Sequence, residues 1–326
     1  MSEPLLEVTD LTVSFPTDTG ELDAVRGLSY HVAPREVVAM VGESGSGKSA
    51  AAMAVIGLLP EYAEVSGSVR LGGRELLGLS DAEMSQIRGR RIGTVFQDPM
   101  SALTPVYTVG DQIAEAAALH LHLDRNAAMK RALEMLELVE IPAARQRLHE
   151  YPHQLSGGMR QRVMIALALS CNPSLLIADE PTTALDVTIQ AQILALLDKL
   201  RHEIGMAVLF VTHNLGVVAE IADRVVVMYS GRVVEEGDVR QLFGAPRHPY
   251  TRALLRSVPD FDERRAHLES IVGMPPDLIR PPSGCRFHPR CEIAHADCSE
   301  VDPELIQLGD RRATACRYHE ELAPRA

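Results

Sequence analysis

The feature that most constrains this chain is a glycine-rich octapeptide between an apolar run and a helix-like segment. Residues 42–49 read Gly-Glu-Ser-Gly-Ser-Gly-Lys-Ser and match the pattern GxxxxGK[ST]. The run 37–41 predicts a strand buried on both faces, and residues 49–59 predict a helix. In that context the N–H groups of the loop and the helix N-terminus can converge on an anion. The sequence therefore predicts a phosphate-binding loop, with an ordinary Gly-Ser turn as the alternative.

The phosphate-loop motif predicts specific roles for its residues. Lys48 is expected to reach the β- and γ-phosphates of a bound nucleotide, and the Ser49 hydroxyl is expected to ligate Mg²⁺. The residues predicted to hold the nucleotide are Gly42, Ser44, Gly45, Gly47, Lys48 and Ser49.

Further apolar runs indicate that the loop belongs to an α/β fold. They are residues 92–96, 175–178, 208–211 and 225–228, with helical patterns between several of them. Strands separated by helices predict a P-loop core with a mixed, mainly parallel sheet. The partly alternating segment 5–15 predicts an antiparallel β edge. Between residues 99 and 172 helix-like stretches at 109–121, 125–139 and 158–170 predict a helical insertion.

Changes in composition and in the predicted secondary structure along the chain predict two domains. Residues 1–258 are expected to form a nucleotide-binding domain, with its α/β core at 1–97 and 173–258 and a helical subdomain at 98–172. Residues 259–326, rich in Pro and Cys, are expected to form a loop-rich C-terminal extension.

Composition narrows the class of protein. Hydrophobic residues make up 46% and charged residues 23% of the chain, which is typical of a soluble globular protein. A net charge of −12 argues against a general nucleic-acid coat protein. The longest uncharged run, 163–178, is interrupted by Asn172-Pro173 and is too short to span a bilayer. With no secretory signal at its start, the chain is expected to be cytoplasmic.

Two further motifs carry chemistry. Residues 175–180 form an apolar strand that ends in Asp179 and Glu180, where ligands bind in open α/β sheets. Asp179 is expected to hold Mg²⁺ and Glu180 to activate water, whereas two acids that merely cap a strand are the alternative. Ser156, Gly157 and Gly158 begin a predicted helix and form a second anion site. Two such sites in one chain suggest a dimer in which each copy closes over the other's nucleotide.

The order of these motifs resembles that of the ATP-binding-cassette (ABC) ATPases. It runs from residues 42–49 through Gln97, Leu-Ser-Gly-Gly at 155–158, residues 175–180 and Ala-Leu-Asp at 184–186 to His213. The resemblance implies a head-to-tail sandwich of two cassettes around Mg-ATP. It also implies that Phe15 stacks on the adenine and Gln97 contacts metal and water. It makes His213 a switch near the γ-phosphate, with a structural histidine as the alternative, and makes Asp186 a contact between cassettes.

Local strings narrow the resemblance to the ATPase subunits of dipeptide and oligopeptide importers. They lie at residues 95–100, 151–155, 186–192 and 247–251. The resemblance implies a second homologous ATPase subunit, two transmembrane permease subunits and an external substrate-binding protein, with no nucleic acid. It implies a peripheral location at the cytoplasmic face of the membrane. Soluble ABC ATPases that act on ribosomes or DNA are the alternative, and the single phosphate loop, the short insertion and the acidic charge disfavour them.

Four cysteines in the extension form a candidate metal site. Cys285, Cys291, Cys298 and Cys316 have the spacing C-x5-C-x6-C-x17-C, and a cytosolic chain rarely keeps such residues as disulfides. Four thiolates can hold Zn²⁺ or a [4Fe-4S] cluster. The string from Gly284 to Cys291 resembles importer subunits associated with a [4Fe-4S] cluster, so that cluster is the expectation, with zinc or four reduced cysteines as alternatives. Cys171 is predicted to be a small buried residue.

Overall fold

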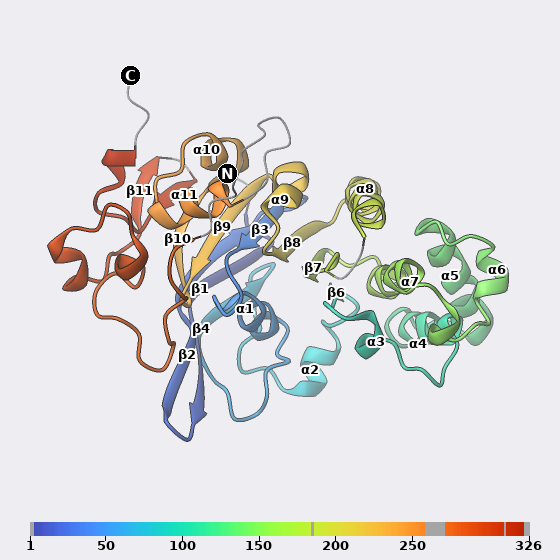
Figure 1. The fold of residues 1–326 in the computed structure, drawn as a ribbon. Helices are drawn as coiled ribbons and strands as arrows, with labels where there is room; N and C mark the ends of the chain where they lie inside the picture. Colours follow the sequence, from blue (N-terminus) through green and yellow to red (C-terminus); the bar gives the residue numbers. More distant parts are fainter. Residues whose placement is uncertain (1–2, 184–185, 258–270, 310, 323–326) are drawn as a thin grey trace. The chain divides into compact units, whose positions relative to one another are not determined.

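The computed structural model describes residues 3–183, 186–257, 271–309 and 311–322 (Figure 1). The chain divides into two compact units. The first comprises Met1–Leu5, Val32–Glu36 and Gly78–Phe210, and the second comprises Leu6–His31, Val37–Leu77 and Val211–Ala326. The predicted domain boundary at 258/259 lies outside the described residues, as do positions 184 and 185 of the Ala-Leu-Asp motif.

The first unit combines parallel strands with a group of helices. Strand β6 (Ile92–Val95) pairs in parallel with β7 (Leu175–Asp179), and β8 (Ala207–Thr212) follows β7 in the sheet. Its helices are α2 (Asp81–Ser85), α3 (Pro99–Ala102), α4 (Val109–Leu121), α5 (Arg125–Leu138), α6 (Ala144–Arg147), the 3-10 turn η1 (Pro152–Gln154), α7 (Gly157–Leu169) and α8 (Val187–Ile204). The three helices predicted between residues 99 and 172 are confirmed as α4, α5 and α7.

Local capping explains where these helices begin. The side chains of Thr108, Asp124 and Ser156 accept hydrogen bonds from the first-turn N–H groups of α4, α5 and α7. Such caps satisfy donors that have no partner within the helix. Helices α4, α5 and α7 pack on one another through buried apolar side chains, which makes one helical layer.

The second unit contains a parallel pair that carries the phosphate loop. Strand β3 (Val37–Val41), buried along its whole length, pairs in parallel with β9 (Arg224–Tyr229). Beyond β9 the sheet continues antiparallel through β10 (Arg232–Asp238), β12 (Arg312–Thr314) and β11 (Ile306–Gly309). Together with the parallel β6–β7 pair, this confirms the predicted α/β fold, with a mixed sheet that contains both parallel and antiparallel pairs.

A separate antiparallel sheet confirms the predicted β edge. Its order is β2 (Gly20–Val32), β1 (Leu6–Thr17), β4 (Glu64–Leu71) and β5 (Arg74–Glu75). The other elements of the second unit are α1 (Lys48–Val55), α9 (Leu215–Ile221), α10 (Val239–Gly244), α11 (Pro249–Arg256) and the 3-10 turns η2 (His288–Arg290), η3 (Ala296–Ser299) and η4 (His319–Leu322).

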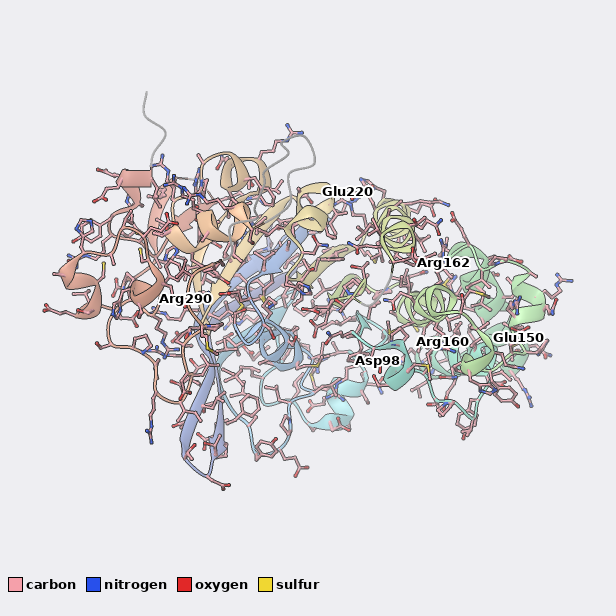
Figure 2. The ribbon with its side chains drawn as sticks, in the orientation of Figure 1. Asp98, Glu150, Arg160, Arg162, Glu220 and Arg290 are labelled. Atoms are coloured by element: carbon pink, nitrogen blue, oxygen red, sulfur yellow. The ribbon has the colours of Figure 1, made fainter. Side chains whose placement is uncertain are left out.

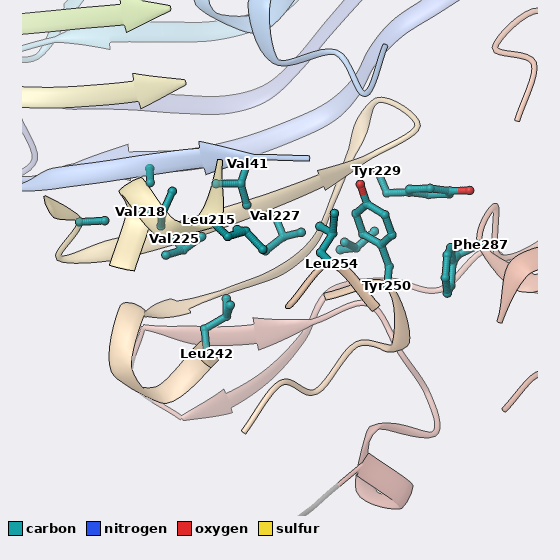
Figure 3. Packing of buried hydrophobic residues seen from close by; sticks show 13 residues of the cluster. Val41, Leu215, Val218, Val225, Val227, Tyr229, Leu242, Tyr250, Leu254 and Phe287 are labelled. Carbon is teal, nitrogen blue, oxygen red and sulfur yellow. The ribbon is translucent and has the colours of Figure 1, made fainter. Parts of the chain in front are cut away.

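The C-terminal extension packs into the core of the second unit. Strand β12 pairs with β10, with Thr314 opposite Glu235. Phe287 belongs to the same buried cluster as Val227 and Tyr250 (Figure 3). Cys285 packs against that cluster. The described part of the extension is loop-rich, but its apolar side chains share a core with the sheet, which the short, Pro-rich pattern of its sequence does not reveal.

Among the described residues, no helix is both long and apolar enough to cross a bilayer.

Candidate nucleotide site and cysteine cavity

The phosphate loop connects β3 to α1. Lys48, the first residue of α1, is only 5% exposed, and its Nζ donates to the carbonyl oxygens of Gly42 and Glu43, both at 2.9 Å. The Ser46 N–H donates to the Glu43 carbonyl at 3.2 Å. The ammonium group is therefore held within the loop, where an anionic group bound by the loop would meet it.

Two glycines of the loop are required by close backbone approaches. Gly47 has φ +99° and Gly42 has φ +156°. A Cβ at Gly47 would collide with the Ala24 carbonyl oxygen, and one at Gly42 would collide with the Met228 carbonyl oxygen. Any other residue at either position would therefore displace neighbouring backbone.

Several other residues of the loop are exposed, although Ser46 is buried. Ser44, Gly45 and Ser49 are exposed, and a Cβ at Gly45 would meet nothing within 4 Å. In the same unit, Phe15 on β1 is half-buried, and its ring lies edge-on to the ring of Tyr62 at a centroid separation of 6.2 Å. Tyr62 is 62% exposed and is a further candidate for stacking on the adenine. The sequence did not single out Tyr62, because it lies in a loop without a motif.

The first unit brings Gln97 and Glu180 together. Asp179 ends β7 and is 5% exposed, and Glu180 follows it with φ +47°. The Glu180 Oε2 accepts hydrogen bonds from Gln97 Nε2 at 3.1 Å and from Thr183 Oγ1 at 3.0 Å. Gln97 and Glu180 are 83 residues apart in the chain, so this contact depends on the parallel pairing of β6 with β7. Thr183 was not predicted.

The Leu-Ser-Gly-Gly motif lies at the start of α7. Ser156 caps the helix by accepting from the Met159 N–H at 3.4 Å. A Cβ at Gly157 would meet nothing within 4 Å, whereas one at Gly158 would lie 3.0 Å from Ile189 Cγ2. The start of this helix thus offers exposed backbone, as an anion site requires.

Asp186 and His213 occupy the starts of two other helices. Asp186 is exposed and caps α8, and its Oδ1 accepts from the Ile189 N–H at 3.0 Å. His213 is exposed between β8 and Asn214, which caps α9. The acids, Gln97, the motif at 155–158 and Asp186 belong to the first unit, whereas the phosphate loop, Phe15 and His213 belong to the second.

The four predicted cysteines line one cavity in the second unit. Cys285, Cys291, Cys298 and Cys316 surround it together with apolar groups that include Phe287. Burial raises the pKa of Cys291 to about 11 and that of Cys316 to about 12, and neighbouring thiols add to both shifts. The pKa of Cys285 is raised for the same reasons. These three thiols are therefore held neutral unless a cationic centre stabilises their thiolates.

Within the described ranges, no three His, Cys, Asp or Glu side chains form a ready-made site for a metal ion. The four thiols therefore line one cavity, but as they stand in the described structure they do not form a metal-binding group. Cys171, outside this cavity, is buried as predicted.

Comparisons with known proteins agree with the motifs and the fold described above. Residues 25–183 match the family model for ABC transporters, and residues 234–298 match the model for the oligopeptide/dipeptide transporter C-terminal region. The oligopeptide transport ATP-binding protein OppD of Mycobacterium tuberculosis is 59% identical over 96% of this chain and 52% of its own. The chain thus spans about half the length of that relative.

Another relative matches along nearly its whole length. The "Probable peptide ABC transporter ATP-binding protein y4tR" of Sinorhizobium fredii is 51% identical, over 98% of this chain and 96% of its own. Among solved structures, the dimeric post-hydrolysis ATP-binding cassette MJ0796 bound to ADP and Pi is 31% identical, with a TM-score of 0.65. The match covers 72% of this chain and 99% of the MJ0796 chain. On the combined evidence of motifs, fold and relatives, the chain belongs to the ABC ATPase family, in the branch that carries the oligopeptide/dipeptide transporter C-terminal region.

Proposed function

We propose that this chain is the ATP-hydrolysing subunit that powers import of dipeptides or oligopeptides through a membrane ABC transporter. The observation that carries the proposal is the presence of a complete phosphate loop and the oligopeptide/dipeptide C-terminal region in one compact unit. Relatives with printed peptide-transport names support the same substrate class.

In this proposal the second unit holds the phosphates. Lys48 neutralises charge on the β- and γ-phosphates, while the N–H groups of the loop and of α1 bind their oxygens. Phe15 contacts the adenine, and His213 senses the γ-phosphate.

The first unit supplies the hydrolytic groups. Glu180 accepts a proton from the attacking water, and Gln97, already hydrogen-bonded to Glu180, orients the same water. Ser49, Gln97 and Asp179 would hold Mg²⁺, which neutralises charge on the phosphates.

Closure requires a partner cassette. Ser156, Gly157 and Gly158 present N–H groups at the start of α7, and we assign them to the γ-phosphate held by a second, homologous ATPase subunit. Asp186 contacts that subunit. ATP binding closes the two cassettes, and the loop after Gln97 transmits the closure to two permease subunits that receive peptide from an external binding protein. The chain then lies at the cytoplasmic face of the membrane and binds no nucleic acid.

The test is affinity purification of the chain from gently solubilised membranes, with identification and stoichiometry of the proteins that co-elute. Two polytopic membrane proteins and a second ATPase are expected, and peptide-loaded binding protein should stimulate ATP hydrolysis by that complex. A chain bound only to itself, to ribosomes or to DNA would refute the importer and favour a soluble ABC clamp.

We further propose that the cysteine cavity holds a [4Fe-4S] cluster. Four partly buried thiols around one cavity suit the four-cysteine ligation of such clusters. When bound, the cluster would supply a cationic cross-link between segments of the extension and a one-electron redox couple. Cys285, Cys291, Cys298 and Cys316 would be its ligands.

Replacing both Cys291 and Cys316 with Ser is expected to reduce bound iron from about four atoms per chain to almost none, since two of four ligands are lost. Iron and acid-labile sulfide are measured after anaerobic purification. The control is Cys171→Ala, which removes a thiol outside the cavity and should keep full iron content. Stoichiometric zinc in the parent chain, or an absence of metal and of visible absorption, would refute the cluster.

A further inference from the structure

We infer that Arg290 and Tyr250 are positioning residues for nucleotide binding, because they hold Glu43, the second residue of the phosphate loop. Arg290 lies in the cysteine-bearing extension, 247 residues beyond Glu43. The inference rests on the proposed role of the loop in binding ATP, and it gives the extension a part in that binding.

Both the side chain and the backbone of Glu43 are held. Arg290 donates from its two terminal nitrogens to the two carboxylate oxygens of Glu43, at 2.7 and 3.0 Å. The Glu43 N–H donates to the Tyr250 hydroxyl oxygen at 2.8 Å. Arg290 is labelled in Figure 2, and its side chain is 4% exposed. A partly buried ion pair with two parallel hydrogen bonds fixes the orientation of the two side chains as well as their separation.

Arg290 is itself fixed by its surroundings. It donates to the Tyr229 hydroxyl at 3.3 Å and to the Val272 carbonyl oxygen at 3.0 Å. Its guanidinium carbon lies 5.8 Å from the ring centroid of Tyr229 and 5.9 Å from that of Phe287, within the range of cation–π attraction. Burial acts to lower the pKa of Arg290, but the hydrogen bonds to Glu43 and Tyr229 raise it overall, so the group stays charged.

Three aromatic rings form the support beneath this contact. The rings of Tyr229 and Tyr250 are 4.5 Å apart, and those of Tyr250 and Phe287 are 5.4 Å apart (Figure 3). Such contacts fix ring orientation. The Tyr250 hydroxyl that receives the Glu43 N–H is therefore held by the same cluster that surrounds Arg290.

One contact then links Glu43 to the phosphate-binding lysine. The Glu43 carbonyl oxygen accepts from Lys48 Nζ at 2.9 Å. A displacement of Glu43 would therefore move an acceptor that fixes the ammonium group. In addition, Arg290 neutralises an acid within the loop that would otherwise repel phosphate. Both effects favour nucleotide binding.

The test is a titration of the full-length chain with the fluorescent nucleotide mant-ADP in the presence of Mg²⁺. Arg290→Met is expected to weaken affinity by roughly 3- to 30-fold, the range for residues that act on a site through intervening contacts. Tyr250→Phe, which removes little besides the hydroxyl, should weaken it in the same direction. Arg290→Lys keeps the charge but loses the two-bond geometry, and its affinity should lie between those of Arg290→Met and the parent.

Glu43→Gln completes a double-mutant cycle. If Arg290 acts through Glu43, the effect of Arg290→Met should be much smaller in the Glu43→Gln background than in the parent chain. Independent, additive effects would overturn the inference. Should Arg290→Met fail to fold, parent affinity in both Tyr250→Phe and Glu43→Gln would overturn it equally.

Arg312→Met is the matched control. Arg312 is also a largely buried arginine of the extension, and it lies 3.6 Å from the Glu235 carboxylate rather than at the loop. This variant should lower the melting temperature while leaving the affinity for mant-ADP at the parent value. Equal losses of affinity in Arg290→Met and Arg312→Met would indicate a merely structural role and refute the inference.

A Lys48→Ala variant separates failure of this inference from failure of the proposed function. If Lys48→Ala leaves the affinity for mant-ADP unchanged, the phosphate-loop assignment itself fails. If only Lys48→Ala weakens binding, the positioning role alone fails.

Discussion

A Glu180→Gln variant is expected to hydrolyse ATP roughly 100- to 10,000-fold more slowly than the parent complex while binding nucleotide with parent affinity, because the change removes a general base and keeps the shape of the side chain. Glu180 suits this role by position. It follows the buried end of β7, and its Oε2 accepts from Gln97 and Thr183, which orient the carboxylate.

The measurement is steady-state phosphate release by the assembled transporter, paired with a nucleotide titration of the same sample. Glu220→Gln is the matched control, because Glu220 is an exposed glutamate on α9, labelled in Figure 2. Its turnover should equal that of the parent. Parent-level turnover in Glu180→Gln would show that another group activates the water.

A Lys48→Ala variant is expected to lose nucleotide affinity itself, by about 10- to 100-fold. A hydrogen bond to a charged group contributes about 1.5–3 kcal/mol, and the variant removes the buried cation of the loop. It also removes the hydrogen bonds from Nζ to the carbonyls of Gly42 and Glu43, so the loop loses an internal support as well.

Mant-ADP titration of the purified chain measures this effect, and a melting curve shows whether the variant remains folded. The chain has only three lysines, and Lys199 offers a control because it is half-exposed and pairs with Glu140 on the surface. Lys199→Ala should bind like the parent. A folded Lys48→Ala chain with parent affinity would contradict the phosphate-loop assignment.

Local features of this protein were predictable because their causes are local. The glycines at 42 and 47, the apolar run of β3 and the lysine that begins α1 lie within a dozen residues, and their pattern reflects backbone constraints at those positions. The same holds for Ser156, whose side chain caps the helix that it begins. The helix predicted at 109–121 appears with the same bounds, and the strand predicted at 5–15 and the helix predicted at 125–139 appear with small shifts of their ends.

Contacts between distant segments were not predictable in this way. The position of Tyr62 beside Phe15 and the addition of β12 to the sheet leave no periodic signal in the sequence. The four cysteines were noticed for their chemistry, and only the folded chain shows that they share a cavity.

The sequence by itself determined the motifs, the strand–loop–helix unit that carries Lys48 and the family to which the chain belongs, since these depend on residues near one another or on their order. Only the tertiary structure decided what surrounds them. The ion pair of Arg290 with Glu43 joins residues that are 247 positions apart in the sequence, and the hydrogen bond of Gln97 with Glu180 joins residues that are 83 positions apart. Such contacts arise when strands pair and apolar faces are buried together, so their partners are selected by the whole fold rather than by neighbouring residues.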